Sequence, residues 1–181
     1  MGGNHMITCC RVRFASATTG RHMGPFPIQH VAITGFEDLK PLISGKVFHA
    51  TTDENYQAIL KSGYVRPNTE DRQSPFGSTA TGFFRRRGCV SVFDYREFGS
   101  AAWREHAFKC LPTMPLEREP VMVLLFVSSA HHASLIPWSL WKEEAAWSER
   151  VVPHVEAGFL GQIPLAAIEL AMILSRQQNA A

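Results

Sequence analysis

The apolar and polar positions along the chain alternate in short blocks that predict strands and helices of modest length. β-Branched and aromatic residues indicate strands at 46–50, 88–95, 119–127, 151–157 and 168–174. The pattern of apolar residues indicates helices at 34–43, 53–63, 97–110 and 137–150. Because the strands cluster late in the chain, with few helices to cross between them, the pattern favours an α+β fold over a doubly wound parallel sheet.

Local signals set the expected ends of these elements. Thr34 and Glu37 have the spacing of a capping box at the start of the first helix. Asp53 is placed to cap the second helix, and Gly63 is placed to stop it. Residues 66–82 are rich in Pro, Asn, Thr, Ser and Gly, a composition that predicts a long loop.

Length and composition fit one ordinary domain. The chain has 181 residues, of which 45% are hydrophobic and 19% are charged, which is enough apolar sequence for one sizeable core. We expect residues 1–30 to form a flexible N-terminal arm or a tag remnant, and residues 31–181 to form a single domain. No run of about 18 apolar residues occurs, so no membrane span is expected.

Cysteine and histidine positions argue against disulfide and metal chemistry. The four cysteines, at positions 9, 10, 89 and 110, form neither a disulfide framework nor a C-x-x-C pair, which favours a reducing, cytoplasmic setting. His131, His132 and His154 have no carboxylate or cysteine at ligand spacing, so we expect no metal site. The net charge of +2 is too small to indicate a nucleic-acid partner by itself.

The end of the strand at 46–50 carries the first candidate chemistry. His49 and Thr51 are two residues apart, so in a strand they point to the same face and present an imidazole and a hydroxyl side by side. Such a pair can grip a sugar hydroxyl or a carboxamide. The alternative is that His49 is a half-buried histidine of the core and that Thr51 begins the following helix.

The stretch FHATTDENYQAILKSG, residues 48–63, resembles the first block of ADP-ribosyltransferase-fold proteins. In that block a strand with His-x-Thr precedes an Asn-containing helix with an Ile-Leu pair and a glycine. DarT-like DNA ADP-ribosyltransferases share the block, as do poly-ADP-ribose polymerases and tRNA 2′-phosphotransferases more loosely. The resemblance implies an ADP-ribosyltransferase-like split β-sheet domain with flanking helices, NAD as the substrate, and cofactor-binding roles for His49, Thr51 and Asn55.

A late glutamate is the second feature that resembles this family. Glu156 precedes GQIPLAAIEL, and DarT-like enzymes similarly carry a catalytic glutamate on a strand that is followed by a turn, an apolar-Pro-apolar stretch and a final strand. The resemblance implies a catalytic role for Glu156. A fixed carboxylate opposes the positive charge that develops on the ribose when the nicotinamide bond of NAD breaks. The alternative is a surface carboxylate that precedes a glycine-rich turn.

The strand at 88–95 adds candidates for the nicotinamide pocket. GCVSVFDY is similar to the central strand of the family, whose hydroxyl or aromatic residues line that pocket. The resemblance implies cofactor-binding roles for Ser91, Phe93 and Tyr95. Alternation puts these three residues on one face of the strand and leaves open whether that face meets the cleft. The alternative for the two aromatic residues is a place in the core.

DarT-like proteins also carry an arginine between the His-x-Thr block and the central strand. FFRRR occupies that interval, which makes Arg85, Arg86 and Arg87 candidates for binding the acceptor. Three guanidinium groups beside Phe83 and Phe84 suit phosphate neutralisation and base stacking on a single strand. The alternative is a charged loop that is solvated.

Together these resemblances predict a cytoplasmic, toxin-like mono-ADP-ribosyltransferase, an enzyme of the glycosyltransferase class that uses NAD and no metal. Single-stranded DNA or RNA is the expected acceptor, and a neutralising antitoxin-type protein is an expected partner. Two alternatives stay open. One is an NAD glycohydrolase, in which water replaces the acceptor, and the other is a non-catalytic module that binds a nucleotide or nucleic acid.

Overall fold

The computed structural model describes residues 25–70 and 72–177. Its strands are β1 (Ile28–Ile33), β2 (Val47–Thr52), β3 (Tyr64–Val65), β4 (Cys89–Asp94), β5 (Val121–Val127), β6 (Ile136–Pro137), β7 (Glu156–Leu160), β8 (Ile163–Pro164) and β9 (Ile168–Arg176). Its α-helices are α1 (Phe36–Ile43), α2 (Asp53–Ser62), α3 (Phe83–Arg86), α4 (Ala101–Ala107) and α5 (Ser139–Glu143). Short 3₁₀ helices occur at η1 (Met114–Glu117), η2 (Ser129–Ser134) and η3 (Leu165–Ala167).

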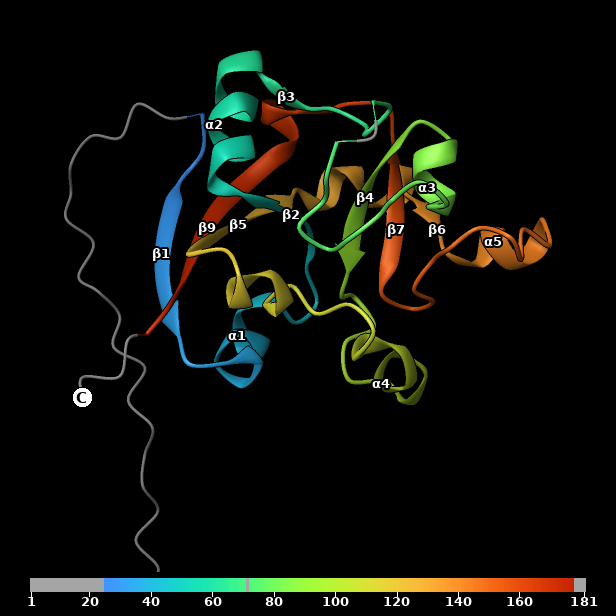
Figure 1. Cartoon of the computed structure of the whole chain (residues 1–181), viewed down its shortest axis with the longest axis horizontal. Helices are drawn as coiled ribbons and strands as arrows, with labels where there is room; N and C mark the ends of the chain where they lie inside the picture. The colour runs from blue at the N-terminus through green and yellow to red at the C-terminus, as the bar shows by residue number, and fades with distance from the viewer. Residues whose placement is uncertain (1–24, 71, 178–181) are drawn as a thin grey trace, which may run out of the picture.

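The strands form one large sheet and one small sheet (Figure 1). The large sheet has seven strands in the order β1-β9-β5-β2-β4-β7-β6 among the described residues, and β3 pairs with β8 separately. Strand β1 runs parallel to β9, whereas the other pairs of the large sheet are antiparallel. This mixed α/β architecture is compatible with the α+β fold that the sequence pattern favours.

Helices cover both faces of the large sheet, with α2 on one side and α1 and α4 on the other (Figure 1). Helix α2 buries Tyr56 and Ile59 in one core. Helices α1 and α4 bury Leu39 and Trp103 in the second core, where they join Phe48 of β2. Both cores form because alternate residues of the central strands point to opposite faces of the sheet.

The large sheet opens between β2 and β4. These strands pair only at Val47 with Asp94 and at Phe48 with Phe93. Beyond Phe48, β2 continues beside β5 as far as Thr52, while β4 continues beside β7. The two halves of the sheet are therefore joined at one end of these strands, and the other ends are free to border a cavity.

The start of α2 differs by one residue from the predicted cap, whereas its end is as predicted. Thr52, not Asp53, caps α2, because its hydroxyl accepts a 3.3 Å hydrogen bond from the backbone amide of Asn55. Gly63 has a left-handed φ of 87° and ends α2, as predicted.

The capping box predicted at Thr34 and Glu37 is wrong. Helix α1 begins at Phe36 with Gly35 as its N-cap, which moves the third helical position from Glu37 to Asp38. The Thr34 hydroxyl donates a 2.6 Å hydrogen bond to the Asp38 carboxylate accordingly.

Several predicted elements are shorter than expected. The helix predicted over 97–110 begins only after Gly99, whose φ is 79°, and Ser100 caps α4 through a hydrogen bond from the Trp103 amide. The helix predicted over 137–150 is reduced to α5. The strand predicted over 151–157 starts only at Glu156, because turns that contain Pro153 precede it.

The predictions at 46–50, 88–95, 119–127 and 168–174 are confirmed as β2, β4, β5 and β9, and the helix at 53–63 is confirmed as α2. Strand β1 was not predicted. It begins at Ile28, so the start expected for the domain, residue 31, is too late. Residues 1–24 of the predicted arm lie outside the described residues. None of the helices in the described ranges is long and apolar enough to cross a membrane.

Candidate active site

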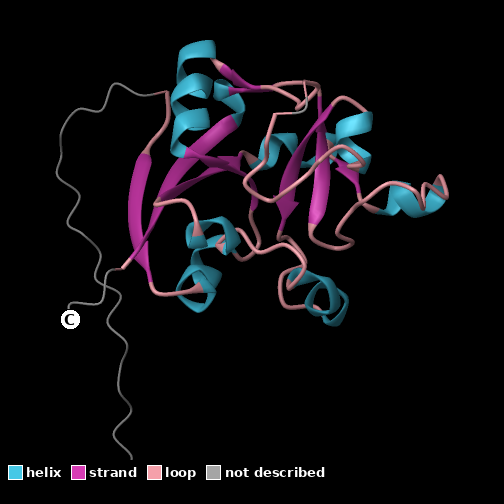
Figure 2. Ribbon diagram, viewed as in Figure 1, coloured by secondary structure: helices cyan, strands magenta, loops and turns pink. Residues whose placement is uncertain are grey.

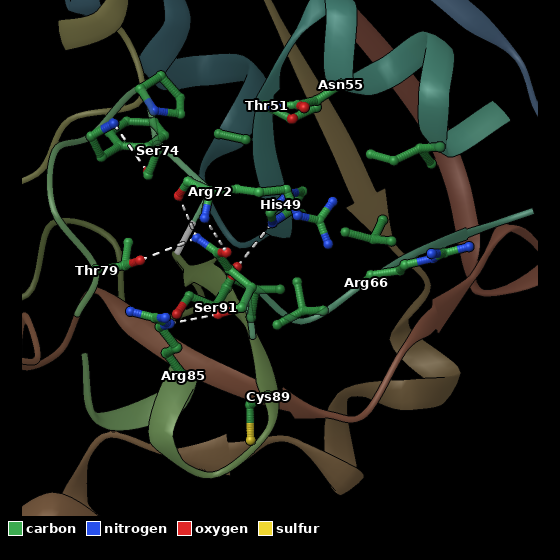
Figure 3. Close-up of a pocket in the computed structure, with 18 of the residues that line it drawn as sticks. His49, Thr51, Asn55, Arg66, Arg72, Ser74, Thr79, Arg85, Cys89 and Ser91 are labelled. Carbon is green, nitrogen blue, oxygen red and sulfur yellow. Dashed lines mark hydrogen bonds between the residues drawn. The ribbon is translucent and has the colours of Figure 1, made fainter. Parts of the chain in front are cut away.

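A cavity of about 400 Å³ lies where β2 and β4 separate, bordered also by α2 and by the connection that Figure 2 draws as loop between β3 and α3. It brings together most of the predicted site residues, which come from distant parts of the chain (Figure 3). Those that line it are His49, Thr51, Asn55, Arg85, Ser91, Phe93 and Glu156. The predicted residues that do not line it are Tyr95, Arg86 and Arg87.

His49 spans the gap between the two halves of the sheet. Its Nδ1 lies 3.0 Å from the backbone oxygen of Ser91 on β4. Because a carbonyl oxygen can only accept, Nδ1 is the protonated nitrogen and Nε2 is left as an acceptor in the neutral ring. Burial lowers the pKa of His49, and the hydrogen bond to Ser91 acts weakly in the opposite direction. The structure thus holds a neutral imidazole at the edge of the cavity.

Thr51 and Asn55 present polar groups to the same cavity from the end of β2 and the first turn of α2. Thr51 is only 3% exposed as a residue, and its hydroxyl has no hydrogen-bond partner among the residues that the structure describes. The hydroxyl is not among the buried polar atoms that lack a partner, so it is accessible from the cavity that Thr51 lines. Thr51 lies in β2 and does not begin α2, whose N-cap is Thr52. Its hydroxyl is available to a ligand.

Both faces of β4 contribute to the cavity because β2 does not pair with this part of the strand. Val90 and Val92 line it from one face, and Ser91 and Phe93 line it from the other. Phe93 is 7% exposed and its ring packs against Phe76 of the loop, with centroids 5.4 Å apart. Because the sheet opens here, residues from both faces of β4 line the cavity.

Tyr95 does not belong to the cavity, and its predicted role in binding the cofactor is wrong. It is fully buried in the second core, where its ring packs edge-on against Phe48 and Trp103. Its hydroxyl has no partner among the described residues, and burial strongly raises its pKa. Tyr95 lies beyond the end of β4, past the pairing of Phe48 with Phe93, where the two halves of the sheet are still joined.

Glu156 begins β7 and lies opposite Phe93 in the sheet. One carboxylate oxygen, Oε2, accepts a 2.6 Å hydrogen bond from the backbone amide of Val152. Burial raises the pKa of Glu156 to about 6, although the Val152 amide and the charge of Arg150 act in the opposite direction. The cavity therefore contains a carboxyl group that titrates near neutral pH and is held in a fixed position.

Cys110 is a cavity residue that the sequence did not single out. It follows α4, and burial together with the nearby Glu156 raises the pKa of its thiol to about 12. A thiol with so high a pKa is not a nucleophile at neutral pH. Cys110 thus contributes an apolar, uncharged wall beside the carboxyl group.

The loop from 66 to 82 adds polar and basic residues that sequence reasoning also missed. Asn68 organises the loop, because its side chain bonds to the backbone amide and carbonyl of Arg72 at 2.9 and 2.7 Å and to the Thr79 hydroxyl at 3.2 Å. Its own carbonyl accepts a 2.5 Å hydrogen bond from Arg85 Nε. Arg66 and Arg72 both line the cavity. The sequence feature that could have indicated these two cavity residues is their position as a pair of arginines in a loop rich in turn residues.

Arg87 is committed to structural contacts. It forms ion pairs with Glu144 and Glu149, the latter at 2.6 Å, and its guanidinium lies 3.6 Å from the centre of the Phe83 ring. Arg86 also pairs with Glu149, at 3.4 Å. Of the three neighbouring arginines, only Arg85 lines the cavity. The three therefore do not form one joint binding site for an acceptor.

The two phenylalanines before these arginines do not stack on an acceptor. Phe83 and Phe84 are 0% and 2% exposed and pack edge-on against each other with centroids 5.2 Å apart. Phe84 also lies where a side chain at Gly158 of β7 would collide with it, so its place is fixed by the sheet. The prediction that these rings stack on bases is wrong because α3 turns both of them into the protein interior.

No group of three or more His, Cys, Asp or Glu side chains in the described ranges is arranged to hold a metal ion. Cys89 and Cys110 are free thiols, while Cys9 and Cys10 lie outside the described residues. Comparisons of the chain with protein-family models, curated proteins and solved structures find no match. The cavity and its side chains are thus the basis on which function is inferred.

If the cavity binds NAD, as the resemblance implies, replacing His49 with alanine should weaken that binding by roughly five- to tenfold, the effect of one lost hydrogen bond. Calorimetric titration with NAD and a thermal melt of the same variant measure binding and stability separately. His30→Ala is the matched control, because His30 is an exposed histidine of the edge strand β1. A large fall in melting temperature with unchanged NAD affinity would show that His49 has a structural role in the core and does not bind NAD.

Proposed function

We propose that the chain is an NAD-dependent mono-ADP-ribosyltransferase with an ADP-ribosyltransferase-like fold. The observation that carries the proposal is the cavity where β2 and β4 separate. It places a carboxyl group of raised pKa, Glu156, in the same space as the imidazole of His49 and the unpartnered hydroxyl of Thr51. The resemblance of residues 48–63 and of the segment after Glu156 to the family supports the same function.

In the proposed reaction, the bond between nicotinamide and ribose breaks and the ribose carbon becomes positively charged. The Glu156 carboxylate stabilises that charge, and it can also take a proton from the attacking group. Its hydrogen bond from Val152 keeps it in place, so little reorganisation is needed during the reaction. The chemistry resembles glycoside hydrolysis, in which a carboxylate performs the same task.

The other cavity residues suit the parts of NAD in distinct ways. The Nε2 acceptor of His49 and the Thr51 hydroxyl suit ribose hydroxyls or the carboxamide. The aromatic rings of Phe76 and Phe93 offer an apolar wall for the nicotinamide ring. The guanidinium groups of Arg66 and Arg72 suit the negative charge of the phosphates.

A nucleic-acid acceptor is the second part of the proposal. A more open hollow of about 310 Å³ is lined by Thr69, Ala80, Arg85 and Arg86. Because Arg85 lines both this hollow and the main cavity, a phosphate bound in the hollow would lie next to the main cavity. A single strand is favoured over a duplex because the base to be modified must reach the cavity.

Incubation of the protein with labelled NAD tests the proposal. Transfer of label to single-stranded DNA or RNA would support the full proposal, and transfer to a protein would support the activity with a different acceptor. Release of nicotinamide without transfer would make the chain an NAD glycohydrolase. Binding of NAD without release of nicotinamide would contradict enzymatic activity and favour a binding module.

The rate of NAD consumption should fall as the pH is lowered through about 6. The pKa of Glu156 is raised to about 6, so the carboxylate that the reaction needs is present above this pH and becomes protonated below it. A pH profile of kcat/KM for nicotinamide release measures the effect. A flat profile between pH 5 and 7 would contradict a role for the ionised form of Glu156.

A further inference from the structure

Arg150 joins the loop from 66 to 82 to the segment that precedes Glu156. Its backbone amide donates a 2.7 Å hydrogen bond to the Thr81 carbonyl, and its own carbonyl accepts a 2.9 Å hydrogen bond from the Phe83 amide. Its guanidinium group donates to the backbone oxygen of Ser78. The end of the loop is thus held by Arg150 through both main chain and side chain.

The segment from 150 to 156 forms a tight turn that fixes the Glu156 carboxyl group. The Val152 carbonyl accepts hydrogen bonds from the amides of Val155 and Glu156, at 3.2 and 3.1 Å, while its amide donates to Glu156 Oε2. His154 within this turn has a positive φ of 60°, a left-handed conformation that is uncommon for residues other than glycine. The position of the carboxyl group therefore depends on a segment whose other end is Arg150.

We propose that Arg150 is a positioning residue that ties the loop from 66 to 82 to the Glu156 carboxyl group. The loop carries Asn68, Arg72 and Phe76 around the cavity, and Arg150 connects its far end to the turn that holds the carboxyl group. A ligand that orders the loop would thereby also stabilise the position of Glu156. This catalytic consequence depends on the proposed function, whereas the structural link does not.

Arg150 also acts on Glu156 through its positive charge, which lowers the pKa of the carboxyl group. Among the residues that the structure describes, two ionisable groups interact with the Glu156 carboxyl group: Arg150, which favours the carboxylate, and Cys110, whose thiol is uncharged at neutral pH. Arg150 is exposed, so water screens its charge and its effect on Glu156 is modest. Removing the guanidinium group should raise the pKa of Glu156 by a few tenths of a unit to about one unit.

The test compares Arg150→Met, Arg150→Lys and the control Arg118→Met in the protein without NAD. Methionine keeps the apolar stem but loses the charge and the donors to Ser78, whereas lysine keeps the charge. Arg118 is an exposed arginine that follows η1, so its replacement changes the net charge equally. Two readouts are measured: the ¹³C NMR titration of the Glu156 carboxyl group, assigned with Glu156→Gln, and the rate at which trypsin cleaves within residues 66–82.

We expect Arg150→Met to raise the pKa of Glu156 and to speed cleavage of the loop several-fold. Arg150→Lys should leave the pKa near that of the parent while cleavage still increases, and Arg118→Met should change neither. An unchanged pKa or an unchanged cleavage rate in a folded Arg150→Met protein would overturn the proposal. If both change in a protein that does not consume NAD, the link stands and the proposed function fails.

Discussion

Replacing Glu156 with glutamine should lower NAD turnover by about a hundredfold or more, while NAD binding and folding are kept. Glutamine has nearly the same shape but no charge, so in the proposed reaction it cannot oppose the positive charge that develops on the ribose. Nicotinamide release under saturating NAD measures kcat, and calorimetry measures NAD affinity. The reduction should appear mainly in kcat, because the charge of the carboxylate is needed most in the transition state.

Glu117→Gln is the matched control for this experiment. Glu117 is an exposed glutamate of η1 and is not among the residues that line the cavity. Its replacement removes the same charge from the chain, and turnover should stay within twofold of the parent. Unchanged nicotinamide release in Glu156→Gln, or an equal loss in both variants, would remove Glu156 from the proposed mechanism.

The glutamine variant also has an expected signature in stability. The pKa of Glu156 in the folded protein, about 6, lies above its ordinary value of 4.5, so folding favours the protonated form. The stability that this group contributes is present below pH 4.5 and is lost as the pH rises through 6. Relative to the parent, Glu156→Gln should therefore gain stability between pH 5 and 7, which thermal melts at several pH values can measure.

The part of the site that the sequence could predict is the part built from local signals. Strand β2, helix α2 and their glycine stop follow from residues that are close in sequence, and His49, Thr51 and Asn55 lie on them. Alternation in a strand placed His49 and Thr51 on one face, and the structure has both lining the same cavity. One-residue errors in the caps did not affect this outcome because the strand itself sets the direction of the side chains.

The part that the sequence could not predict depends on contacts between distant segments. The loop from 66 to 82 was recognisable as a loop, but nothing local indicates that Asn68 bonds to Thr79 or that Arg85 bonds to Asn68. The three arginines at 85–87 look equivalent in the sequence. Only the carboxylates of Glu144 and Glu149, about sixty residues away, separate Arg87 from Arg85.

Tyr95 and Phe93 show how a correct pattern can still give a wrong role. Both residues lie on one face of the chain, as alternation predicts, and both contribute to the second core. They differ in their place relative to the point where β2 and β4 separate. Phe93 forms the last pair before the opening, with Phe48, whereas Tyr95 lies on the other side of that pair, where the two halves of the sheet are joined. The point at which two strands separate is set by pairing across the sheet, which alternation within one strand does not encode.

Replacing Phe48 with alanine should destabilise the protein by about 3–5 kcal/mol, the usual cost of removing a large buried aromatic side chain. Phe48 is fully buried and stacks on Phe93 with centroids 5.1 Å apart, and it also contacts Tyr95 and Phe126. It forms the last pair before β2 and β4 separate. In a domain of this size such a loss lowers the melting temperature by roughly 6–20 °C.

Phe108→Ala is the matched control, because Phe108 is 68% exposed and its replacement should change stability by no more than about 0.5 kcal/mol. Thermal melts of both variants give the comparison. Since Phe48 holds the two halves of the sheet together beside the cavity, Phe48→Ala should also weaken NAD binding under conditions where the variant remains folded. If instead the variant melts like Phe108→Ala and binds NAD like the parent, Phe48 does not secure the junction from which the cavity opens.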